Sequence, residues 1–199
     1  IEVCQRSYNL LNGLGYTPSD IIFDPNILTV ATGMDEHLDY AYDYIRATKW
    51  IRENLPGCGV CGGVSNLSFA FRGNNPLREA MHAVFLYHAM NAGMTMAIMN
   101  PATTVSYDEI EPDLRKAIED VLFNERTAES VERLASLGQE MKAENKEIQQ
   151  EASNEKLPLD QRLANALVKG DSSQLPTDLQ EAMTAYSNPV DVISRPFMT

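Results

Sequence analysis

The feature that most constrains the fold is a unit of apolar strand, polar loop and helix that occurs three times in the first two-thirds of the chain. The predicted strands cover 20–24, 59–64 and 94–99. The predicted helices that follow them cover 34–54, 76–91 and 112–124, and another helix precedes them at 3–14. Units of this length imply parallel strands joined by right-handed crossovers, with the chemistry at the carboxyl ends of the strands.

Polar side chains follow all three strands: Asp24 with Asn26, Ser65 with Asn66, and Asn100. Asp24 comes directly after three apolar residues, so we expect a partly desolvated carboxylate that needs a hydrogen-bonding partner. That partner is either a ligand or a backbone N–H of its own loop, because Asp-Pro commonly opens a turn. The first alternative makes Asp24 a binding residue, and the second makes it a loop cap.

Asn66 follows two glycines, and glycines at a strand end let a ligand approach the backbone closely. Its amide supplies a donor and an acceptor to the edge of a heterocycle, although it could equally satisfy its own loop. Arg72, six residues later, either pairs with an anionic substrate tail or faces solvent. For each of these residues the sequence leaves a ligand-binding role and a purely structural role open.

Two other motifs favour structural roles. Cys58 and Cys61 form a CxxC, but a spacing of three within a strand puts the side chains on opposite faces, so we expect buried strand thiols rather than a redox or zinc site. His82 and His88 lie six residues apart on a predicted helix, which is not the spacing of a helical metal pair. Surface or packing roles are expected for both, and for His37.

The last third of the chain has a different composition. Residues 128–152 are rich in Glu, Lys, Gln and Ala with a sparse apolar stripe, which predicts a long, largely solvated helix or linker. Shorter amphipathic helices are predicted over 159–170 and 176–186, and a third after Pro189. They are typical of the opening of a small helical module.

The charge balance restricts the partners. With 16 Lys and Arg against 28 Asp and Glu, the formal net charge is −12, which excludes a nucleic-acid backbone or an anionic membrane as the main partner. The sequence lacks an apolar run long enough for a membrane span and a recognisable secretion signal. Three cysteines fit reducing conditions, so we expect a cytoplasmic protein.

Three segments together resemble the pterin-binding domain of cobalamin-dependent methionine synthases: Phe23-Asp24-Pro25-Asn26-Ile27-Leu28-Thr29, the segment from Gly62-Gly63-Val64-Ser65-Asn66 to Arg78-Glu79-Ala80, and Phe85-Leu86-Tyr87-His88-Ala89. The later segments 162–170 and 189–193 are similar to the start of the helical cap over cobalamin in that family.

The resemblance implies an α/β fold: the C-terminal portion of a TIM (β/α)8 barrel with about three βα units, then a helical linker and the beginning of an α-helical bundle. The implied domains are 1–126, 127–156 and 157–199. Because a TIM barrel has about eight strands, we expect these 199 residues alone to be catalytically incompetent, with unpaired strand edges that favour self-association.

The implied activity is transfer of the N5 methyl group of methyltetrahydrofolate to cob(I)alamin, which then methylates homocysteine. Asp24, Asn26, Asn66, Arg72 and Asn100 would bind the pterin, and Asn66 would be the catalytic residue beside N5. Cobalamin would be held mainly by a cobalamin domain of the parent chain, and zinc would belong to that parent and not to these residues.

Two alternatives remain open. A stand-alone folate:corrinoid methyltransferase shares the Asp and Gly-x-Ser-Asn positions, but it has no reason to continue into the segment 157–199. Alternatively, the chain is a non-catalytic interaction module whose acidic helices bind another protein, and Asp24 and Asn66 are then ordinary loop caps. The loop motifs of dihydropteroate synthase, which shares the barrel and the pterin, are not found.

Overall fold

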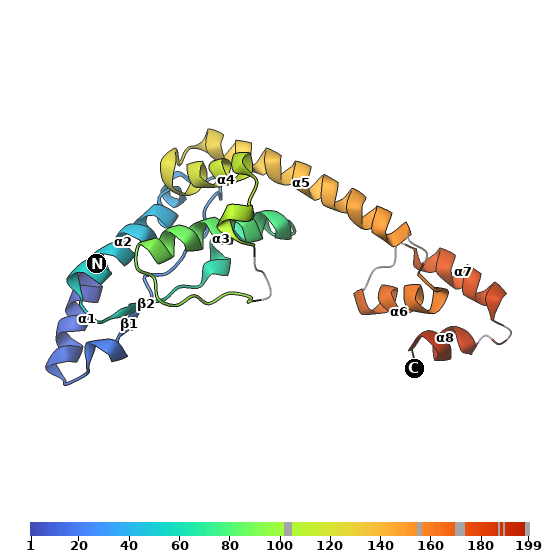
Figure 1. Cartoon of the computed structure of the whole chain (residues 1–199), viewed down its shortest axis with the longest axis horizontal. Coiled ribbons are helices and arrows are strands. Elements are labelled where there is room, and N and C mark those ends of the chain that lie inside the picture. Colours follow the sequence, from blue (N-terminus) through green and yellow to red (C-terminus); the bar gives the residue numbers. More distant parts are fainter. Residues whose placement is uncertain (102–104, 155–156, 170–173, 187, 189, 198–199) are drawn as a thin grey trace. The chain divides into compact units, whose positions relative to one another are not determined.

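A computed structural model of the chain describes residues 1–101, 105–154, 157–169, 174–186, 188 and 190–197. The chain divides into two compact units, Ile1–Glu144 and Asn145–Thr199 (Figure 1). The first unit contains a small parallel sheet and most of the buried residues, and the second is helical. The expected ends of the linker (155–156) and of the helix at Gly170 lie outside the described residues.

The sheet of the first unit has two short parallel strands, β1 (Ile22–Phe23) and β2 (Gly59–Val60), with Ile22 opposite Gly59 and Phe23 opposite Val60. The pairing continues for one more bond, because the amide of Cys61 donates to the carbonyl of Phe23 at 2.8 Å. Gly63 then leaves the extended conformation (φ −83°, ψ 87°), and a 3-10 turn follows. The second strand is therefore shorter than the predicted 59–64.

The predicted third strand, 94–99, was wrong as a continuous strand. The described residues form only an isolated parallel bridge between Gly63 and Ile98. The amides of Thr95 and Met96 both donate to the carbonyl of Val60, and two successive amides on one carbonyl do not build a regular ladder. The segment nevertheless runs beside β2 in the parallel direction, so the carboxyl ends of all three segments lie at the same edge.

Four helices of the first unit follow the predicted order: α1 (Glu2–Gly13), α2 (Tyr40–Asn54), α3 (Asn75–Asn91) and α4 (Pro112–Glu119), the last extended by a π turn at Asp120–Asn124. The predicted start of α2 at Met34 was wrong. Met34 is extended, and the acidic residues after it form a separate 3-10 turn, Asp35–His37, which is fixed by a 2.7 Å hydrogen bond between Thr32 Oγ1 and His37 Nδ1.

Local sequence accounts for the helix ends. The side chain of Asn74 accepts a hydrogen bond from the amide of Leu77, and Pro76 occupies the first turn of α3. The carboxylate of Glu111 caps α4 in the same way, at 2.9 Å from the amide of Leu114. Both helices then bury one apolar face; the fully buried side chains of α3 include Leu77, Met81, Val84 and Phe85.

α5 (Ala128–Asn154) was predicted as largely solvated, and its first half is not. Leu134 is fully buried, and Leu137 and Met141 pack against the core. Gly138 explains how α5 approaches α3 so closely: a Cβ at that position would lie 2.6 Å from a methyl carbon of Leu77. The sparse stripe is therefore a packing surface.

The second unit contains α6 (Leu159–Lys169), α7 (Leu175–Ala185) and α8 (Asp191–Phe197), which contact one another. Arg162 of α6 pairs with Asp178 of α7 at 3.0 Å, and Leu163 and Ala182 are fully buried. Several apolar side chains stay exposed, namely Leu167, Val168, Met183, Val190 and Ile193. None of the helices in the described ranges is both long and apolar enough to cross a membrane.

Candidate functional site

The first strand ends in a turn made by Asp24. Its Oδ1 accepts a hydrogen bond from the amide of Asn26 at 2.9 Å, and Asn26 has a left-handed backbone (φ 64°), which asparagine tolerates better than most residues. The expected desolvation of Asp24 was wrong, because the residue is exposed. The turn still leaves the carboxylate with further acceptor positions, since an ionised carboxylate has about four lone-pair sites.

The second strand leads into a 3-10 turn, Val64–Asn66, that presents Asn66 at the surface. The carbonyl of Asn66 accepts a hydrogen bond from Thr29 Oγ1 at 2.9 Å, and the amide of Val30 donates to the carbonyl of Leu67 at 3.1 Å. These two bonds join the loop after β1 to the loop after β2. The predicted neighbours Asp24 and Asn66 thus stand on loops that are held together.

Glycine is required where these loops meet. A Cβ at Gly62 would lie 2.6 Å from both Tyr44 Oη and Ile27 Cδ1, so a larger residue would displace one of them. A Cβ at Gly63 would lie 3.3 Å from the side-chain nitrogen of Asn66, which shows that the amide of Asn66 lies over this glycine. The two glycines therefore serve the packing of the loop as well as access to it.

Tyr44, on α2, is hydrogen-bonded to the backbone just after β2. Its hydroxyl donates to the carbonyl of Cys61 at 2.8 Å, and the residue is 3% exposed. Burial raises the pKa of Tyr44 well above its usual value, and the negative charge of Asp24 raises it further. Tyr44 therefore stays protonated and links α2 to the end of β2.

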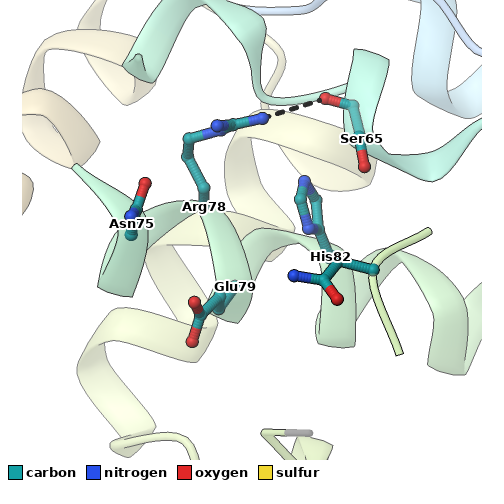
Figure 2. Close-up of a pocket in the computed structure, with 6 residues that line it drawn as sticks. Ser65, Asn75, Arg78, Glu79 and His82 are labelled. Carbon is teal, nitrogen blue, oxygen red and sulfur yellow. Dashed lines mark hydrogen bonds between the residues drawn. The ribbon is translucent and has the colours of Figure 1, made fainter. Parts of the chain in front are cut away.

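A cavity of about 180 Å³ lies between the loop after β2 and the end of the segment 94–99. Its lining residues are Ser65, Asn75, Arg78, Glu79, His82 and Asn100. Asn75, Arg78, Glu79 and His82 project from the first two turns of α3, and the guanidinium of Arg78 points toward Ser65 (Figure 2). Ser65 and Asn100, two of the predicted strand-end residues, thus share one cavity.

Arg78 and His82 were not among the predicted site residues. They are four residues apart on α3, so they share a helix face, and the polar pair at that spacing is the signal that could have found them. His82 Nε2 lies 2.7 Å from Ser68 Oγ, and Arg78 Nε donates to the same hydroxyl at 3.0 Å. Burial, followed by the positive charge of Arg78, lowers the pKa of His82 to about 4.

Of the predicted ligand residues, Asn100 lines this cavity, whereas Asp24, Asn26, Asn66 and Arg72 lie outside its lining. Arg72 is exposed, and its guanidinium stacks over the ring of Phe69 at 3.5 Å from the centroid.

The expectation of two buried strand thiols was only partly right: Cys58 is buried and Cys61 half-buried, both are free thiols, and they flank β2 rather than lie in it. Burial raises the pKa of Cys58. His82 has the packing role expected of it, although in a polar network.

The sequence model that describes pterin binding enzymes matches residues 1–100 of the chain. The chain belongs to the pterin-binding enzyme family. The matched range includes the loops of Asp24 and Asn66, and it ends at Asn100, the last residue that lines the cavity. Every residue predicted to contact the ligand therefore lies in the part of the chain that the family relationship covers.

Proposed function

We propose that the chain is part of a folate-dependent methyltransferase of the methionine synthase type, in which it contributes the last units of a pterin-binding TIM barrel. The observation that carries this proposal is the common edge at which three parallel segments end. Asp24, Asn66 and Asn100 come after these ends, and all three lie within the residues that match the family. Ligands bind at the carboxyl edge of parallel strands. The remaining strands, about five for a closed barrel, would come from sequence beyond this chain or from a partner.

The residue types suit methyl transfer from the N5 of methyltetrahydrofolate. The carboxylate of Asp24 would accept hydrogen bonds from the amino-pyrimidine edge through positions that the Asn26 turn leaves open. Arg72, Asn26 and Asn100 are proposed as further contacts to the substrate. Together they would fix the ring relative to the incoming nucleophile, and positioning of this kind contributes strongly to rate.

Asn66 would act at N5 itself. A tertiary amine is a poor leaving group unless a proton or hydrogen bond reaches its nitrogen as the C–N bond breaks. An amide is not an acid, but the carbonyl oxygen of Asn66 would accept a hydrogen bond from a protonated N5, and its Nδ2 would donate to the ring. The exposed position of Asn66, with its backbone held by Thr29, is compatible with this role.

Cobalamin would supply the cobalt nucleophile that takes the methyl group. The exposed apolar side chains of α6–α8 are suited to cover an apolar face of a corrin, and Met183 and Ile193 are among them. The three histidines of the chain all lie in the first unit, so the second unit offers no imidazole to the metal. These helices would therefore cover the cofactor without ligating it.

The decisive experiment replaces Asn66 with alanine in the complete methyltransferase and follows methyl transfer from methyltetrahydrofolate to cob(I)alamin by the corrinoid absorbance. Removal of a hydrogen-bonding group that acts in the transition state is expected to slow the transfer about 10²-fold or more. Asn91→Ala, at the exposed end of α3, is the matched control and should retain the full rate.

Equal rates in the Asn66→Ala and Asn91→Ala enzymes would contradict the proposal and favour the interaction module, in which Asn66 is only a loop residue. Folding must be intact in both variants for the comparison to count, as judged by unchanged circular dichroism. For the chain by itself, calorimetric titration with methyltetrahydrofolate is expected to give weak binding or none, because most of the barrel edge is missing.

A further inference from the structure

The side chains of Arg78, Ser68 and His82 form a hydrogen-bonded chain beside the loop of Asn66. The Nε–H of Arg78 donates to Ser68 Oγ at 3.0 Å, so the hydroxyl proton of Ser68 is free to be donated to His82 Nε2, 2.7 Å away. Ser68 is fully buried and His82 is 7% exposed. Because a hydroxyl has one donor and two acceptor positions, Ser68 can hydrogen-bond to Arg78 and to either neutral tautomer of His82.

The same arginine holds the loop at a second point. Its Nη2 donates to the carbonyl of Ser65 at 3.4 Å (Figure 2), and its Nε donates to the hydroxyl of Ser68. These two contacts lie immediately before Asn66 and two residues after it. The carbonyl of Asn66 itself is bound by Thr29. The backbone of Asn66 is consequently fixed on both sides and from the opposite loop.

Arginine suits this task better than lysine would. Its planar guanidinium presents several donors in a fixed fork, so one side chain can bind the Ser68 hydroxyl and the Ser65 carbonyl together. Ser68 contacts His82 directly, Arg78 is the charged group that acts on it, and Glu79 and Asn100 line the same cavity. The carboxylate of Glu79 points away from the Arg78 guanidinium (Figure 2), so Arg78 is free to bind the loop.

We propose that Arg78 and His82 are positioning residues, which act through Ser68 and Ser65 to fix the loop that presents Asn66 to a ligand at the strand edge. The identity of that ligand as a reduced pterin rests on the proposed function. The positioning itself does not, because the contacts belong to the chain without any ligand. Neither residue needs to touch the substrate.

The first test reads the orientation of Asn66 directly. In the ¹⁵N-labelled 199-residue chain, the pair of side-chain amide signals of Asn66 is assigned by its loss in Asn66→Asp. Arg78→Lys and Ser68→Ala should each shift or broaden this pair, whereas Arg115→Lys, on α4, should leave it unchanged. His82→Gln keeps an acceptor for Ser68 and should disturb the signals less than His82→Leu.

Unchanged Asn66 signals in folded Arg78→Lys and Ser68→Ala would overturn the proposal. If Arg78→Lys fails to fold, Ser68→Ala decides alone, because it removes a single hydroxyl oxygen from the network. If His82→Leu fails to fold, the signals of His82→Gln are compared with those of the original chain instead. Each result therefore either supports the positioning role or refutes it.

The second test uses the complete methyltransferase. Arg78→Lys is expected to lower methyl-transfer kcat/KM about 10²-fold, comparable with a misplacement of the reacting groups by about 1 Å. His82→Gln should restore most of the activity that His82→Leu loses. If Asn66→Ala has no effect on methyl transfer, the proposed function is wrong, and the amide signals still test the positioning role. If Asn66→Ala slows transfer but Arg78→Lys is fully active, only the positioning role is wrong.

Discussion

Acidification should destabilise the first unit through one buried histidine. The pKa of His82 falls from its usual 6.5 to about 4 in the folded chain, because burial and then the charge of Arg78 disfavour the imidazolium. The unfolded chain therefore binds this proton at a higher pH than the folded chain does. The stability that depends on neutral His82 is complete above pH 6.5 and is lost as the pH falls toward 4.

The magnitude follows from the two pKa values. At pH 5 the unfolded imidazole is almost fully protonated and the folded one is largely neutral, so the linkage amounts to about 2 kcal/mol relative to pH 7. Protonation would also place a second positive charge beside Arg78, which already donates to the same Ser68 hydroxyl. An effect of this size is a large fraction of the stability of a small domain.

The assay is urea unfolding at pH 7 and pH 5, followed by the fluorescence of Trp50, the single tryptophan, which packs against the core of the first unit. The comparison protein is His82→Gln, which keeps an acceptor for Ser68 but does not titrate. We expect the original chain to lose about 2 kcal/mol more than His82→Gln between the two pH values. His37 and His88 are present in both proteins, so the difference between the two proteins isolates His82.

The same pH dependence in both proteins would refute this reasoning, because it would mean that His82 titrates alike in the folded and unfolded chains. A greater acid loss in His82→Gln would reverse the sign and imply that the folded protein binds the proton.

Two further predictions concern packing and charge. Gly62→Ala should cost about 1–3 kcal/mol in urea unfolding, since its Cβ would lie 2.6 Å from the Tyr44 hydroxyl, whereas Gly13→Ala, which meets nothing within 4 Å, should be neutral or slightly stabilising. Burial alone would raise the pKa of Asp120, but its ion pairs lower it, and Arg133 reaches it at 2.7 Å. Asp120→Asn should therefore cost about 1–3 kcal/mol at pH 7, and the difference should shrink as the pH falls below the ordinary carboxyl value.

The elements that the sequence predicted well are those decided locally. α3 and α4 have a proline in the first turn, a capping side chain and a dense apolar face, and all of these are readable within one helix. The strands were predicted too long because their extent depends on pairing between distant segments. The amides of Thr95 and Met96 share one carbonyl of Val60, and no pattern within 94–99 indicates this.

α5 illustrates the same limit for helices. Its composition is that of a solvated helix, yet Gly138 allows close contact with Leu77 of α3, and Asn74 donates to the Gly138 carbonyl at 2.6 Å. A glycine within a helix is normally a cost to stability. Its packing purpose becomes evident only when the partner helix is known.

Some residues of the candidate site could be chosen from the sequence, and others are found only in the fold. Asp24, Asn66 and Asn100 could be selected from sequence because the end of a parallel strand is itself a sequence position. The groups that hold Asn66 are spread over two loops and a helix, so their partnership is a product of tertiary structure. Spacing does place Arg78 and His82 on one face of α3, but Ser68 joins them only because the loop after β2 folds back onto that face. A candidate binding residue can thus be chosen from where a strand ends, whereas the residues that contact its loop are found only in the fold.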